Sequence, residues 1–211
     1  MAFRTKRTIF YHIPKTGGQW VKKAILESTG GLERVPGKYI TDEVKSLRLL
    51  GSHQIPATVR HDESLFSFAF VRHPLSWYRS FWASRFEDSL DKPFLISWLW
   101  DKNPEEFIRN VIRKYPRGFL TKVYRYYVGK DCNRLDFVGR QEYLADDLIL
   151  ALKLGRENFD EDKIKKLERI NIAGTKSKYR DSFKISIAVE KSLLDSERWI
   201  INNYYDQYDG F

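Results

Sequence analysis

The residues Lys15, Thr16, Gly17 and Gly18 place a cation, a hydroxyl and two glycines just after the apolar and β-branched run 8–13. The run is typical of a buried strand, and a helical pattern begins near its second glycine. Glycines let backbone amides approach an anion closely, and the N–H groups and dipole of a helix N-terminus favour negative charge. The spacing therefore predicts a cradle for an anionic group, to which Lys15 adds a mobile positive charge.

The order of residues in this loop distinguishes it from the common ATP-binding loop. A Walker A sequence places its lysine after the glycines, whereas Lys15 precedes them. The sequence supplies no obvious second motif for holding magnesium, so no metal is expected. The alternative interpretation is a polar turn without a ligand. The position of the loop between a strand and a helix favours binding.

A second cluster lies at the end of another apolar run, 67–71. Arg72 follows that run, Pro74 suits the first turn of a helix, and Ser80 comes eight residues after the arginine. Eight residues make a little over two turns, so Arg72 and Ser80 are expected to face the same side and to bind one phosphate. Taken alone, the pair is more often a surface arginine and a helical serine.

Together the two segments resemble the PAPS-dependent sulfotransferase family, whose donor is 3′-phosphoadenosine 5′-phosphosulfate (PAPS). The 5′-phosphosulfate loop of that family is similar to Pro14-Lys15-Thr16-Gly17-Gly18, and its 3′-phosphate motif is similar to Arg72-His73-Pro74 followed by Ser80. The resemblance implies a P-loop-like sulfotransferase architecture. It also implies that PAPS is the donor and 3′-phosphoadenosine 5′-phosphate (PAP) the product.

The resemblance assigns roles to particular residues around the donor. It implies that Trp20 stacks near adenine, although helix core is the commoner place for such a residue. Gln19 stands where relatives usually have Ser or Thr, so the hydroxyl contact expected there is lost or replaced by an amide donor. The donor-binding residues implied as a set are Lys15, Thr16, Gly17, Gly18, Gln19, Trp20, Arg72, Ser80, Lys178 and Arg180.

Two further segments resemble the family more weakly. The segment 137–142 is similar to one that contributes to the nucleotide site in relatives, and it is expected to lie nearby. The segment 176–183 is similar to a basic stretch that closes over the 3′-phosphate, with Lys178 and Arg180 as its cations. A solvated basic loop is an equally good interpretation of the second segment.

The expected chemistry needs a group that stabilises charge on the departing oxygen and a base for the acceptor proton. Lys15 suits the first task. Histidine suits the second because its usual pKa lies near neutral pH, and His53 resembles the base of the family's Thr-His-Leu-Pro type segment. A carboxylate near His61 is the alternative base, while His12 and His73 are interpreted as braces for the two loops.

The whole chain has 211 residues, 42% of them hydrophobic, and a formal net charge of +9. We expect a single sulfotransferase-like domain over residues 1–211 with an anionic partner. The lone Cys132 excludes an internal disulfide. No apolar stretch is long enough for a signal peptide or a membrane span, so a cytoplasmic protein is expected.

The elements that must position these residues alternate between strands and helices. This alternation predicts an α/β fold with a central, mainly parallel β-sheet flanked by helices, and ligands at the carboxyl ends of its strands. Strands are expected at 8–13, 49–53, 67–71 and 136–139, and helices at 18–28, 74–86, 104–114, 117–128, 142–154 and 182–204.

The acceptor is expected to be a hydroxyl of a carbohydrate or small molecule, and the residues do not specify it or the oligomeric state. One alternative function is nucleic-acid binding, indicated by the positive charge and by aromatic and basic residues side by side, namely Lys122, Tyr124, Arg125, Tyr126 and Tyr127. No nucleic-acid-binding module is legible, so nucleic acid is not an expected partner. The other alternative is a magnesium-dependent phosphoryl transferase that uses ATP.

Overall fold

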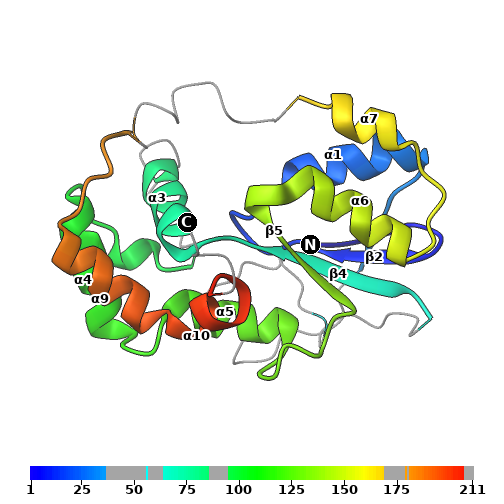
Figure 1. Ribbon diagram of the computed structural model, residues 1–211. Coiled ribbons are helices and arrows are strands. Elements are labelled where there is room, and N and C mark those ends of the chain that lie inside the picture. Colours follow the sequence, from blue (N-terminus) through cyan, green and yellow to red (C-terminus); the bar gives the residue numbers. More distant parts are fainter. Residues whose placement is uncertain (37–55, 57–63, 86–94, 169–178, 180, 207–211) are drawn as a thin grey trace. The chain divides into compact units, whose positions relative to one another are not determined.

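A computed structural model describes residues 1–36, 56, 64–85, 95–168, 179 and 181–206 (Figure 1). The chain divides into two compact units. Of the described residues, the first unit holds 1–36, 56, 64–72 and 124–168, and the second holds 73–85, 95–123, 179 and 181–206. The single domain over residues 1–211 stays a prediction. The strand predicted at 49–53 lies outside the described residues.

The first unit is built on a mixed sheet of five strands in the order β3-β1-β2-β4-β5. Parallel pairing joins β2 to β4 and β4 to β5, whereas β1 is antiparallel to both β2 and β3. The strands are β1 (Ala2–Arg4), β2 (Thr8–Tyr11), β3 (Glu33–Val35), β4 (Phe66–Val71) and β5 (Phe137–Arg140).

The sheet is mixed where the sequence analysis predicted a mainly parallel one. β1 and β2 are joined by residues 5–7 alone, and so short a connection can make only an antiparallel hairpin. Thr5 holds this turn, since its backbone N–H donates to the carbonyl oxygen of Thr8 at 3.0 Å. The parallel part is limited to β2, β4 and β5, which are the strands that lead into the predicted site.

Helices α1 (Gly18–Thr29) and α6 (Leu144–Leu154) cover one face of this sheet, and α7 (Glu161–Lys166) packs on α1 (Figure 1). Between β5 and α6 lies the short 3-10 helix η3 (Gln141–Tyr143). Under α1 and α6 the rings of Phe10, Phe68 and Phe70 pack with centroids 5.4–6.0 Å apart. These buried rings pack β2 against β4. Because β2, β4 and β5 are parallel, their carboxyl ends lie at the same edge of the sheet.

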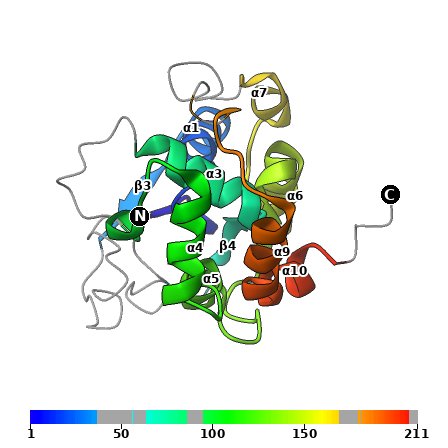
Figure 2. The ribbon, with the colours of Figure 1, turned by 90° about the vertical axis from the view of Figure 1, so that its left-hand side faces the viewer.

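The second unit is helical in its described part. It contains α3 (Pro74–Ser84), η2 (Ser97–Leu99), α4 (Pro104–Lys114), the first half of α5 (Phe119–Val128), α9 (Ile187–Ser196) and α10 (Arg198–Tyr204). Helices α3, α4 and α9 pack against one another, and α10 packs on α9 (Figure 2). The core is aromatic: the rings of Trp77 and Phe81 are stacked, with centroids 5.3 Å apart, and Phe81 stacks on Phe107.

Most predicted helices are confirmed to within a few residues, and α4 begins and ends where it was predicted. Asn103 caps α4, since its side-chain oxygen accepts from the amides of Glu105 and Glu106. The predicted single helix at 182–204 is wrong, because the helix is interrupted at Glu197, which separates α9 from α10. None of the helices in the described part of the chain combines the length and apolar character needed to cross a membrane.

Candidate anion-binding site

The loop between β2 and α1 is shaped by two residues in the left-handed region, Lys15 with φ 67° and Gly17 with φ 85°. Between them, the Thr16 hydroxyl donates to the carbonyl oxygen of Ile13 at 2.9 Å, and the threonine is fully buried. A lysine rarely adopts this backbone conformation, and such residues gather at functional sites. The loop is thus a fixed turn that Thr16 ties to the end of β2.

Packing within the chain favours glycine at both positions of the loop, and most strongly at Gly18. A Cβ atom at Gly17 would lie 2.8 Å from Cδ2 of Leu144, and one at Gly18 would lie 1.8 Å from Cδ2 of His12. His12 is 7% exposed and its ring lies against Gly18 in the first turn of α1, while its role as a brace stays a prediction. Close approach of an anion is therefore not the only reason for glycine here.

The first turn of α1 has no anion of its own. Gly17 offers no side-chain cap and the turn contains no acidic residue. Among the described residues, no group accepts a hydrogen bond from the amides of Gly18 and Gln19. Such N–H groups, together with the helix dipole, create a positive potential at the loop.

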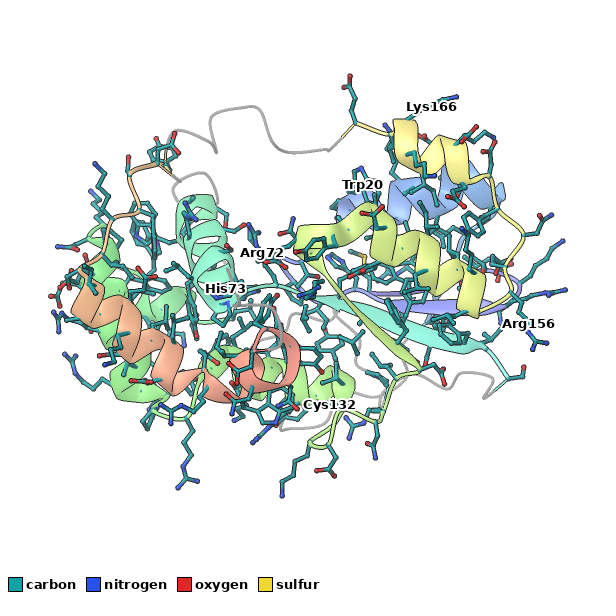
Figure 3. All side chains as sticks on the ribbon, in the orientation of Figure 1. Trp20, Arg72, His73, Cys132, Arg156 and Lys166 are labelled. Carbon is teal, nitrogen blue, oxygen red and sulfur yellow. The ribbon has the colours of Figure 1, made fainter. Side chains whose placement is uncertain are left out.

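Arg72 brings a full positive charge to this loop from the carboxyl end of β4. Its Nη1 donates to the carbonyl oxygen of Lys15 at 3.2 Å. Tyr124 fixes the backbone of Arg72, because the Tyr124 hydroxyl accepts from the Arg72 amide at 2.9 Å and donates to the Arg72 carbonyl oxygen at 3.0 Å. Figure 3 shows Arg72 at this edge of the sheet. The structure thus brings together Arg72 and the Lys15 loop, as the sequence predicted for two separate motifs.

The end of β5 adds a third cation at the same edge, because Arg140 pairs with Val71 of β4. Its guanidinium lies 4.5 Å from the centre of the Tyr143 ring, and its backbone amide donates to Oδ2 of Asp147 at 2.6 Å. Burial raises the pKa of Asp147, whereas the hydrogen bond from Arg140 lowers it.

The segment 137–142 lies beside the loop, as predicted. A Cβ atom at Gly17 would lie 3.6 Å from Cγ of Gln141 and 2.8 Å from Leu144. The contributions of Leu144 and Tyr124 were missed in the sequence analysis. Neither residue carries a local signal, since a leucine or tyrosine at helical spacing indicates packing in general.

The remaining predicted residues fall into three groups. Gln19 is exposed on α1, while Trp20 is 5% exposed among the core side chains, so its stacking on adenine stays a prediction. Ser80 is 5% exposed on α3 of the second unit, and its pairing with Arg72 stays a prediction. His53, Lys178 and Arg180 lie outside the described residues.

We compared the chain with protein-family models, with curated proteins and with solved structures, and none of the three comparisons found a match.

Proposed function

We propose that this protein is a sulfotransferase that binds PAPS at the loop before α1 and transfers its sulfuryl group to an acceptor hydroxyl. The observation that supports this most is the 3.2 Å hydrogen bond from Arg72 Nη1 to the Lys15 carbonyl oxygen. It joins two motifs that lie 57 residues apart, at a helix N-terminus that no side chain of the described residues caps. Each motif is weak alone, and their convergence favours a ligand with negative charge at two places.

In this proposal the two ends of the nucleotide have different partners. The amides of Gly18 and Gln19, with Thr16, Gly17 and Lys15, hold the 5′-phosphosulfate. The 3′-phosphate is bound by Arg72 and Ser80, with Lys178 and Arg180 closing over it, and Trp20 lies near adenine. The side-chain amide of the exposed Gln19 takes the place of the Ser or Thr hydroxyl that relatives usually have there.

The transfer itself needs little beyond positioning and charge. The acceptor oxygen attacks the sulfur in line, the bond from sulfur to the phosphate oxygen of PAP breaks, and His53 takes the acceptor proton. Lys15 neutralises the charge that grows on the departing oxygen, a contribution typically worth about 10²–10³ in rate. No metal takes part, and the acceptor is a carbohydrate or a small molecule.

The proposal extends to the architecture and the location of the protein. The parallel strands β2, β4 and β5, whose carboxyl ends lead to Lys15, Arg72 and Gln141, support a P-loop-like sulfotransferase architecture. A cytoplasmic location and a single domain over residues 1–211 belong to the same proposal.

Titration calorimetry with PAP, compared with magnesium ATP, tests the assignment. We expect PAP to bind and ATP to bind much more weakly. Arg72→Ala and Lys15→Ala should each weaken PAP binding about tenfold or more, because each removes a charge-assisted contact. Lys23→Ala is the matched control, since this lysine is exposed on α1 and pairs only weakly with Glu27 at 3.6 Å.

Other outcomes of this titration contradict the proposal. A preference for magnesium ATP would instead support the phosphoryl transferase, and salt-sensitive binding of RNA or DNA without PAP binding would support the nucleic-acid function. A second step uses His53→Ala, which should bind PAP like the wild type and lose sulfuryl transfer. An equal loss of PAP binding would make this histidine structural.

A further inference from the structure

A second basic region of the first unit lies at the opposite end of its sheet from the glycine loop. There, a hollow of about 400 Å³ is lined by residues from the β1–β2 turn, the starts of β4 and β5, and the end of α6. Figure 3 shows Arg156 at this end of the sheet and Arg72 at the other. The two sites are therefore separate, and binding at the hollow does not depend on the proposed sulfotransferase activity.

Three cations line this hollow, Lys6 and Arg7 from the turn and Arg156 from the end of α6, against one carboxylate, that of Asp136. The two segments are tied together, because Arg7 Nη1 donates to the carbonyl oxygen of Arg156 at 2.9 Å. The side chains of Lys6 and Arg156 make no ion pair or hydrogen bond with any residue that the structure describes. Their charges are therefore available to a ligand.

The nearby carboxylates are occupied by neutral donors instead of these cations. Both the amide and the hydroxyl of Ser67 donate to Oδ2 of Asp136 at 2.7 Å. Glu157, which follows the hollow in sequence, accepts from the Thr5 hydroxyl and from the Arg7 amide. These contacts hold the acids to the turn and to the start of β4.

Arg156 also occupies a backbone position that normally belongs to glycine. Its φ of 53° is left-handed, and it follows α6 in a C-terminal motif in which the amide of Arg156 donates to the Lys153 carbonyl and that of Glu157 to the Leu152 carbonyl. An arginine costs stability at such a position, where glycine has no penalty. A residue kept there against its backbone preference points to a role for its side chain.

We propose that this hollow binds a phosphate or sulfate ester. The forked donors of Arg156 and the ammonium group of Lys6 hold the charged oxygens. The body of the ligand packs on the apolar side of the hollow, where Leu154 is 50% exposed and Phe66 is half-buried. The ester comes either from a soluble ligand or from the headgroup of an anionic lipid.

The test is residue-resolved NMR of the full chain, titrated with phenyl phosphate and with inorganic sulfate. We expect the amides of Lys6, Ser64 and Arg156 to shift with both, and more strongly with phenyl phosphate because its ring packs on Leu154. Arg156→Gly is the decisive variant: it should melt at a higher temperature, because it relieves the left-handed arginine, and yet bind about tenfold more weakly. Lys130→Ala removes an exposed cation that does not line the hollow, and it should change neither property.

Sedimentation with vesicles separates the two sources of the ester. If phosphatidylcholine vesicles that contain phosphatidic acid pellet the wild type but not Arg156→Gly, the ester is a lipid headgroup. If phenyl phosphate shifts the three amides and no vesicle pellets the protein, the ligand is soluble. The proposal is overturned if none of the three amides shifts and no vesicle binds, or if Arg156→Gly binds phenyl phosphate as tightly as the wild type.

Discussion

Two helices of this protein begin in the same way and differ in what their N-termini bind. Helix α1 follows Gly17 with φ 85°, and α5 follows Gly118 with φ 79°. At the start of α5, the carboxylate of Glu197 accepts from the amides of Leu120 at 2.9 Å and Thr121 at 2.7 Å. At the start of α1, no described side chain takes this place.

The difference shows how one backbone geometry serves two purposes. Glu197 is fully buried, and its carboxylate also accepts from the hydroxyls of Tyr78 at 2.6 Å and Thr121 at 2.7 Å. In the second unit the positive end of a helix is thus satisfied by the chain itself and serves stability. In the first unit the amides of Gly18 and Gln19 have no acceptor among the described residues, and the proposed function assigns them an anion from outside.

The largest effect on stability is expected from removing the negative charge of Glu197 at the start of α5. Glu197→Gln should lower the free energy of unfolding by about 3 kcal/mol, because the new amide group directs its own N–H bonds at buried donors. Urea unfolding followed by circular dichroism measures this loss. Asp195→Asn on the same helix is the control and should cost less than about 1 kcal/mol, since its pair with Arg198 is exposed.

The pH dependence of this effect has a definite sign. Burial raises the pKa of Glu197, and the hydrogen bonds from Tyr78 and Thr121 lower it without reversing the shift. A carboxyl whose pKa is raised by folding binds more protons in the folded chain than in the unfolded chain. Its contribution to stability therefore falls as pH rises from about 4.3, the ordinary pKa of a glutamate, through the pKa in the folded protein. The gap between wild type and Glu197→Gln should therefore narrow over that range, and a gap that widens contradicts the shift.

The next largest effect is expected at the start of α1. Gly18→Ala places a Cβ atom against the His12 ring, and such overpacking should cost about 1–3 kcal/mol and abolish PAP binding. His12→Ala in the same chain should restore part of both. Gly31→Ala is the control, because nothing lies within 4 Å of its Cβ position; it should leave PAP binding unchanged. Wild-type PAP binding by Gly18→Ala would mean that the loop geometry does not matter.

The smallest effect on stability is expected when α1 is given an anion of its own. Gln19→Glu adds an acid to the first turn, which should stabilise the protein by about 0.3–1 kcal/mol through the helix dipole. The same charge should repel PAP and weaken its binding about tenfold. Gln19→Ala separates charge from loss of the amide and should bind PAP more tightly than Gln19→Glu. Equal PAP affinity for both variants would show that the N-terminus of α1 does not bind the nucleotide.

The sequence predicted those elements whose ends carry local signals. Thr8 and the following apolar residues predicted β2, Gly18 predicted the start of α1, and helical spacing from Pro104 onward predicted α4. β1 and β3 have three residues each and were missed, since they form only by pairing with neighbours in the sheet. Local pattern cannot predict an element that depends on such pairing.

The site shows the same division. The loop around Lys15 and the position of Arg72 after a strand could be predicted from the sequence, because glycines and strand ends are local features. The break at Glu197 was missed, since apolar spacing continues through 187–204 and the break depends on a carboxylate that reaches α5, 76 residues away in sequence. For the same reason, the clamp that Tyr124 places on Arg72 could not be predicted.

The most direct test of the central claim is to follow the amides of both helix N-termini by NMR while PAP is added to the wild-type chain. We predict that the amide resonances of Gly18 and Gln19 shift with PAP, and that those of Leu120 and Thr121 stay in place because Glu197 occupies them. If PAP leaves Gly18 and Gln19 unmoved at concentrations that saturate the protein, the N-terminus of α1 is not the anion site and the proposed function is wrong.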